Sequence, residues 1–222
     1  MWVRYSALAN ILLSDITEND YDSYNYEVVA VMRQIIQSPR INEFAVIFIA
    51  YLIAYALVAF AVEPVQHYFV SSSTMAGSLL FIPHGIRVLA AWLCGVRAIL
   101  PLILAEFLGS MWLWQPDVGT SVILGSSMVG GLCVYLTFEV FRLTGIELQS
   151  DGKDSGLTNW KSLILIASIA SVFNSIGKEI FFQSLVPLAD QMLIVSMFWI
   201  GDTLGTLACL LLLIGVRRRF RF

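Results

Sequence analysis

Long apolar stretches dominate this chain and limit its fold more than any other feature. A helix needs about 20 apolar residues to cross the hydrocarbon core of a bilayer. Six stretches meet or approach this length: 43–62, 78–95, 98–114, 120–141, 162–182 and one within 191–216. Because lipid offers no partner for backbone polar groups, such stretches fold as helices. The sequence therefore predicts an all-α, polytopic transmembrane bundle of about six spans.

The composition excludes most other classes of protein. Of the 222 residues, 58% are hydrophobic and 13% are charged, whereas soluble domains carry about 25% charged residues. This charge is too low for a soluble globule or a disordered chain. The net charge of −3 does not favour a nucleic-acid partner. Cys94, Cys133 and Cys209 lie inside apolar runs without metal-ligand spacing, so we expect no disulfide framework, metal or cofactor.

The distribution of Lys and Arg predicts the orientation in the membrane. Cytoplasmic loops are enriched in these residues. If both termini are cytoplasmic, every basic connection falls on one side, and the opposite loops carry Glu63, Asp117 and Asp190 but no Lys or Arg. The basic residues concerned are Arg4, Arg33, Arg40, Arg97, Arg142, Lys153, Lys161, Arg217, Arg218, Arg219 and Arg221.

Three parts of the chain are expected. Residues 1–42 form a cytoplasmic N-terminal segment, in which helical spacing of apolar residues predicts an amphipathic helix over 27–37. This helix is either a structural element at the membrane surface or a docking helix for a partner. Residues 43–216 form the transmembrane bundle. Residues 217–222 form a basic tail, which either anchors the topology or contacts anionic headgroups or a cytoplasmic partner.

Small residues recur at helical spacing in two of the predicted spans. Gly125 and Gly130 belong to such a pattern in the fourth span, and Gly201 and Gly205 form a pair in the sixth. Small residues allow helix backbones to approach closely in lipid. We interpret these glycines as packing positions within the bundle, with an interface between copies of the chain as the alternative.

Ionisable residues inside the spans are the main functional signal, because each is costly in a bilayer. Arg87, Glu106, Lys178 and Asp202 come from four different spans, and residue counting places all four in the outer half. On the fifth span, Asn174 shares one helix face with Lys178. We therefore predict that these charges meet, with His84 and Asn174 as neutral hydrogen-bond partners.

Three interpretations of this charge cluster are open at this stage. In the first, the charged side chains pair only with one another and fix the register of the helices. In the second, they line an outward-facing cavity for a small ligand. In the third, they take part in ion or proton translocation. The inner halves of the spans are almost purely apolar, which weakens the third interpretation. His67 and His84 are the only histidines and belong to no catalytic or metal-binding motif, so we expect no enzyme activity.

Three sequence patches, taken together, resemble a known family. They are FIPHGI at 81–86, GVR at 95–97 ahead of a proline-bearing helix, and WIGDTLG at 199–205. This order is similar to the first type of membrane-associated sensor domain (the MASE family) of bacterial signalling proteins. The resemblance covers about residues 45–215. It implies a six-span module of the bacterial inner (cytoplasmic) membrane that takes part in signal transduction.

The resemblance also suggests roles for individual residues. In that family the domain is usually joined to an output enzyme, and this chain stops at Phe222, so a stand-alone sensor domain that signals to a separate protein is expected. Pro83 and Gly85 are expected to open a helix at the outer interface. Its free N–H groups beside Arg87 would then favour an anion.

The function predicted from these observations is that of a non-catalytic integral membrane sensor or anchoring subunit. It would bind a small ligand or a partner's transmembrane helix through the polar cluster. The expected partners are the lipid bilayer, a separate membrane or cytoplasmic signalling protein, and a second copy of the chain, with no nucleic acid. The alternatives are a small transporter or its substrate-binding subunit, and a structural scaffold subunit of a membrane complex.

Overall fold

The computed structural model describes residues 39–69, 78–113, 118–145, 160–182 and 188–220. All regular secondary structure in these residues is helical, which confirms the predicted all-α class. The chain divides into two units, residues 1–45 and 46–222, and the second unit holds the bundle. The predicted amphipathic helix over 27–37 lies outside the described residues.

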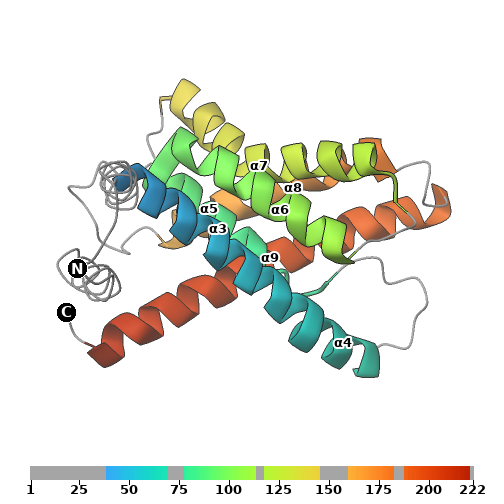
Figure 1. The fold of residues 1–222 in the computed structure, drawn as a ribbon, viewed down its shortest axis with the longest axis horizontal. Coiled ribbons are helices and arrows are strands. Elements are labelled where there is room, and N and C mark those ends of the chain that lie inside the picture. Colours follow the sequence, from blue (N-terminus) through green and yellow to red (C-terminus); the bar gives the residue numbers. More distant parts are fainter. Residues whose placement is uncertain (1–38, 70–77, 114–117, 146–159, 183–187, 221–222) are drawn as a thin grey trace, which may run out of the picture. The chain divides into compact units, whose positions relative to one another are not determined.

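The first helical run extends beyond its predicted end at residue 62. It consists of α3 (Pro39–Leu57), a π-helical turn η1 (Val58–Val62) and α4 (Glu63–Phe69) (Figure 1). Pro64 has no N–H and its ring crowds the preceding turn, which normally breaks a helix. The wider turn of η1, closed by the N–H of Glu63 on the carbonyl of Val58, carries the helix into the proline.

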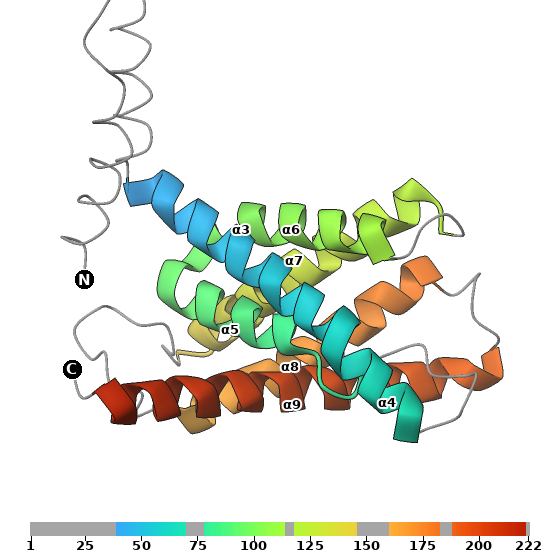
Figure 2. The same cartoon turned by 60° about the horizontal axis from the view of Figure 1, so that its bottom comes forward.

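The next two helices form a hairpin. α5 (Ile82–Cys94) ends at Gly95, the 3-10 turn η2 (Gly95–Ala98) follows, and α6 (Ile99–Leu113) runs in the opposite direction (Figure 2). Gly95 has φ 56° and ψ −134°, a backbone conformation that favours glycine. At 1.5 Å per residue, α5 and α6 are about 20 and 22 Å long, shorter than the hydrocarbon core of about 30 Å.

Three longer helices complete the bundle: α7 (Thr120–Leu143), α8 (Trp160–Phe182) and α9 (Leu188–Phe220). Consecutive helices from α6 to α9 pack against each other, and α9 returns to pack against α5. α9 continues through Arg217 to Phe220 without a break, so most of the predicted 217–222 tail extends this helix.

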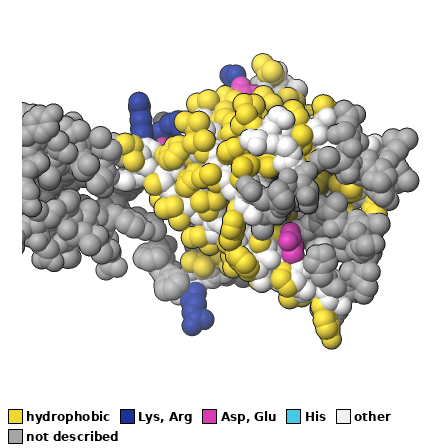
Figure 3. All heavy atoms as spheres, turned by 45° about the vertical axis from the view of Figure 1, so that its right-hand side comes forward, with side chains coloured by type: hydrophobic (Ala, Val, Ile, Leu, Met, Phe, Trp, Pro, Cys, Tyr) yellow, Lys and Arg dark blue, Asp and Glu magenta, His cyan; other side chains and the backbone are white. Residues whose placement is uncertain are grey.

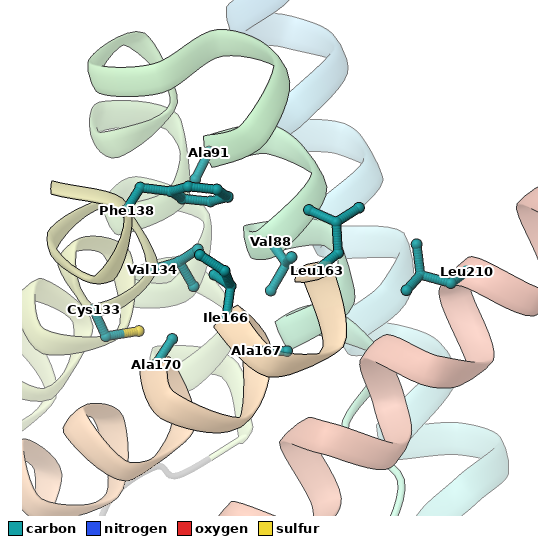
Figure 4. Packing of buried hydrophobic residues seen from close by; sticks show 10 residues of the cluster. All are labelled: Val88, Ala91, Cys133, Val134, Phe138, Leu163, Ile166, Ala167, Ala170 and Leu210. Carbon is teal, nitrogen blue, oxygen red and sulfur yellow. The ribbon is translucent and has the colours of Figure 1, made fainter. Parts of the chain in front are cut away.

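The apolar core has two parts, and α5 contributes to both. One part joins α5, α7, α8 and α9 around Ile166 and Val134 (Figure 4). The other joins α3, α5, η2 and α6 around Tyr51 and Leu102. Many core residues are alanines, which allow the helices to pack closely. α5 is therefore the central helix of the bundle, and its side chains are buried on several faces.

The outer surface of the bundle is apolar. Large hydrophobic side chains are exposed along every long helix, including Val46, Leu108 and Leu212, and Figure 3 shows them covering much of the described part of one face. Five helical segments are long and apolar enough to cross a membrane: Arg40–Gln66, Ile82–Trp112, Thr120–Leu143, Trp160–Phe182 and Gln191–Val216. The second of these is the α5–α6 hairpin, where the sequence predicts two separate spans.

Candidate functional site

A buried polar cluster lies where α5, α6, α8 and α9 meet, next to the apolar core. It brings together all the ionisable side chains that the sequence singles out at this depth, together with their predicted polar partners. Its members are Tyr51, His84, Arg87, Glu106, Ser171, Asn174, Lys178 and Asp202. Except for the rim residue Lys178, all are buried.

Glu106 is the shared anion of one half of the cluster. Its Oε1 lies 2.7 Å from Arg87 Nη2 in an ion pair and accepts a hydrogen bond from Lys178 Nζ at 2.6 Å. The side chains of Arg87 and Glu106 are 0% and 1% exposed, whereas that of Lys178 is 14% exposed. A carboxylate paired with two cations is a strong electrostatic link in a medium that excludes water. Here it ties α5, α6 and α8 together.

Aromatic residues complete the surroundings of the Arg87 guanidinium. Arg87 Nη2 donates to the Tyr51 hydroxyl at 2.6 Å, and Arg87 Cζ lies 5.5 Å from the Tyr51 ring centre and 5.6 Å from that of Phe81. Such cation–π contacts lower the cost of burying a guanidinium. Tyr51 is not among the site residues that the sequence predicts. Its only signal is a phenol inside an apolar run, and tyrosine is common in such runs.

Asp202 organises the other half of the cluster. Its Oδ2 accepts from Ser171 Oγ at 2.9 Å and from Asn174 Nδ2 at 3.0 Å. His84 Nδ1 lies 3.4 Å from the same oxygen, and His84 Nε2 lies 3.2 Å from the carbonyl oxygen of Ala167. Ser171, Asn174 and Lys178 share one face of α8, as their spacing predicts. That face joins the two halves.

The cluster leaves several buried polar atoms without a hydrogen-bond partner among the described residues. They are Arg87 Nε and Nη1, Glu106 Oε2, Asn174 Oδ1 and His84 Nδ1. Each such atom costs about 1–3 kcal/mol when nothing replaces its bond to water. The cluster is thus balanced in charge, with two cations and two anions when His84 is neutral, but it is incomplete in hydrogen bonds.

Each of the four predicted packing glycines is buried at a helix contact within this chain. A Cβ atom on Gly130 would overlap the Glu106 carboxylate, and one on Gly125 would overlap the Phe181 ring. Gly201 and Gly205 allow the backbone of residues 78–82 to lie on α9. Gly130 therefore does more than pack helices, because it makes room for a charged group.

The start of α5 differs from its expected role as an anion site. Pro83 and Gly85 do lie in its first turn, and Gly85 packs against Cys209. However, the Phe81 N–H donates to Gly201 O at 2.9 Å, and those of Ile82 and His84 donate to Leu80 O and Phe81 O. All three N–H groups are therefore bonded within the chain, and the acceptor for that of Phe81 comes from the close packing on α9. They are not free to bind an anion.

The remaining charges of the spans lie apart from the cluster. Glu139 pairs with Arg142 at 2.6 Å at the exposed end of α7. Glu179 lines an apolar groove of about 440 Å³ between α8 and α9, together with Ile176, Gln191, Met192 and Val195. Among the described residues, no group of His, Cys, Asp or Glu side chains is placed to hold a metal ion.

Comparison with known proteins adds no identification: no protein-family model, curated protein or solved structure matches the chain. The assignment of a function therefore depends on the geometry of the cluster. In that geometry, Arg87 and Lys178 both form ion pairs with Glu106.

Proposed function

We propose that this protein is a non-catalytic membrane subunit of the sensor type, and that the buried cluster around Arg87 and Glu106 is its recognition site. The observation that carries the proposal is the set of unpaired polar atoms on Arg87, Glu106 and Asn174. A network that served only to fix helix register would gain stability by pairing these atoms. Their retention favours a site completed by another molecule.

The chemistry of the unpaired atoms limits what binds. Arg87 Nε and Nη1 require acceptors, whereas Glu106 Oε2 and Asn174 Oδ1 require donors. The ligand is therefore a small molecule with both donors and acceptors, or a polar side chain on a partner's transmembrane helix. Lys178, at the exposed rim, marks the access route.

Two helices link this site to the ends of the bundle. α5 bears His84 and Arg87 and packs against α7, α8 and α9. α9 bears Asp202 in the cluster and runs without interruption to the arginines at 217–219. A change in the cluster therefore moves helices that reach the basic end of the chain, where a separate signalling partner or anionic headgroups would bind.

In the membrane, we propose that both arms of the α5–α6 hairpin cross, which gives six spans and two cytoplasmic termini. The positions of Arg97, Arg142 and Lys161 support this orientation, because all three lie at helix ends that six spans would place on one side. The resemblance of residues 81–86, 95–97 and 199–205 to bacterial membrane-associated sensor domains supports placement in a bacterial inner membrane.

Native purification in polymer-bounded lipid particles tests the function. Mass spectrometry would identify the small molecules and proteins that the wild type, Arg87→Met and Arg142→Met retain. We expect the wild type and Arg142→Met, a matched change at the exposed ion pair, to retain a component that Arg87→Met loses. Equal retention by Arg87→Met would argue against the site. Substrate uptake into proteoliposomes would instead indicate a transporter, and instability without one fixed partner would indicate a scaffold.

A further inference from the structure

The two ring nitrogens of His84 both face oxygen atoms. Nε2 lies 3.2 Å from the carbonyl oxygen of Ala167 on α8, and Nδ1 lies 3.4 Å from Oδ2 of Asp202 on α9. The His84 side chain is 0% exposed and that of Asp202 is 2% exposed. Both side chains are therefore buried, and Nδ1 has no hydrogen-bond partner among the described residues.

A neutral imidazole satisfies only one of these contacts. One of its nitrogens carries a proton and the other carries a lone pair. If Nε2 donates to Ala167, then the lone pair of Nδ1 faces the carboxylate of Asp202. If Nδ1 donates to Asp202, the lone pair of Nε2 faces the carbonyl oxygen. Each tautomer places two acceptors against each other in a buried site, which is unfavourable.

We propose that His84 and Asp202 form a buried proton-binding site, in which His84 is the doubly protonated imidazolium and Asp202 its carboxylate partner. Both ring nitrogens then donate, one to each oxygen. The proposal does not depend on the ligand of the Arg87 half, because it rests on the His84 contacts alone.

The proton of this pair lies on His84, and Asp202 is the carboxylate. Its Oδ2 already accepts from Ser171 Oγ at 2.9 Å and from Asn174 Nδ2 at 3.0 Å. Donors that converge on one oxygen stabilise the charged carboxylate. Protonation of Asp202 would weaken both bonds, because a neutral carboxyl oxygen is a weaker acceptor than a carboxylate oxygen. The extra proton therefore belongs to the imidazole ring.

The other charges of the cluster affect how tightly His84 holds this proton. With the proton, the cluster carries one net positive charge, and Arg87 and Lys178 both oppose a third cation, while Glu106 favours it. Asp202 itself comes from α9, and the titratable groups around the pair come from the other helices: Tyr51 on α3, Arg87 on α5, Glu106 on α6, Cys133 on α7 and Lys178 on α8. Burial of the charge and the two neighbouring cations disfavour the proton, whereas the two new contacts favour it.

Release of this proton would act on helix packing. The imidazolium joins α5 to the backbone of α8 through Ala167 and to α9 through Asp202. Loss of the proton converts one of these contacts into a repulsion between acceptors. We therefore expect the contact between α5 and α9 to weaken on deprotonation, so that the occupancy of the site by a proton controls the position of the long helix α9.

Nitrogen-15 NMR of the histidine rings tests this site in the full chain. The sequence has only two histidines, and His67→Gln identifies the signal of His84. The protein would be labelled with ring-¹⁵N histidine and studied in lipid nanodiscs from about pH 5 to about pH 9. We expect both ring nitrogens of His84 to be of the protonated type at neutral pH and one of them to shift downfield at the alkaline end.

Asp202→Asn and Glu139→Gln provide the variant and its control. We expect Asp202→Asn to convert His84 to a neutral ring with one protonated nitrogen at neutral pH. Glu139→Gln removes the same charge from an exposed ion pair and is expected to leave the His84 signals unchanged. An unprotonated ring nitrogen in the wild type across the whole pH range would overturn the proposal. If Asp202→Asn does not fold, the wild-type spectrum alone still decides.

Discussion

Gly130 on α7 lies directly against the carboxylate of Glu106 on α6, which occupies the space that a Cβ atom at position 130 would need. Glu106 in turn holds Arg87 and Lys178. One missing methyl group therefore permits an ion triad that joins three helices. The relationship explains why a glycine belongs at this point of α7, although glycine lowers the intrinsic stability of a helix.

Gly130→Ala is expected to destabilise the bundle. The added methyl group would displace the Glu106 carboxylate, and overpacking a core costs about 1–3 kcal/mol before any loss of ion pairing. Thermal unfolding in nanodiscs would measure the effect. Gly215→Ala is the matched control, since Gly215 is also helical and no atom lies within 4 Å of the position that a Cβ would take. We expect this control to match or exceed the wild type in stability, and equal losses in both variants would contradict the role of Gly130.

Glu106→Gln is expected to be among the most harmful substitutions in the chain. It leaves Arg87 and Lys178 without their shared counterion, and loss of one partner from a buried ion pair costs about 3–5 kcal/mol. Chemical denaturation would measure the loss of stability. The same substitution at Glu139, whose partner Arg142 is exposed, should leave stability unchanged.

A double variant tests whether the triad acts as a unit. The double variant Lys178→Met/Glu106→Gln removes the Glu106 anion together with one of the two cations that Glu106→Gln leaves uncompensated. We therefore expect the double variant to be more stable than Glu106→Gln alone, a non-additive result. If the two losses of stability simply add, then Lys178 and Glu106 do not interact in the folded protein, contrary to their distance of 2.6 Å.

The sequence predicts which residues meet but not how they pair. Arg87, Glu106, Lys178 and Asp202 could be identified because charges in apolar spans avoid lipid. Their pairing depends on the rotation of each helix, which follows from packing in the assembled bundle. Glu106 takes both cations, and Asp202 instead takes Ser171 and Asn174 as donors. No spacing rule in the sequence distinguishes this arrangement from its reverse.

The fold shows a similar division between what the sequence predicts and what requires the structure. Apolar length places α7, α8 and α9 within a few residues of their observed bounds. It does not predict that the first helix continues past Pro64, because that depends on the π-helical turn at Val58–Val62. It places the end of the second span at Gly95, whose positive φ ends α5, but it starts that span at residue 78, whereas α5 begins at Ile82.

Gly95→Ala tests this turn. A residue with a Cβ atom is strained at φ 56°, and a strained backbone position costs about 1–3 kcal/mol. We expect a lower unfolding temperature for Gly95→Ala. Gly119→Ala is the control, because Gly119 has φ −60° and no atom lies closer than 3.9 Å to the position that a Cβ would take. Wild-type stability in Gly95→Ala would show that the turn between α5 and α6 adopts another conformation.

Single cysteines in the turn before α6 and at the start of α7 test the number of membrane crossings. In a variant without Cys94, Cys133 and Cys209, Val96→Cys would lie in the exposed turn before α6 and Thr120→Cys at the exposed start of α7. If α5 and α6 each cross, a membrane-impermeant maleimide should label position 96 only from the cytoplasmic side and position 120 only from the opposite side. Labelling of both positions from one side would mean that α6 does not cross, and that the bundle has fewer than six spans.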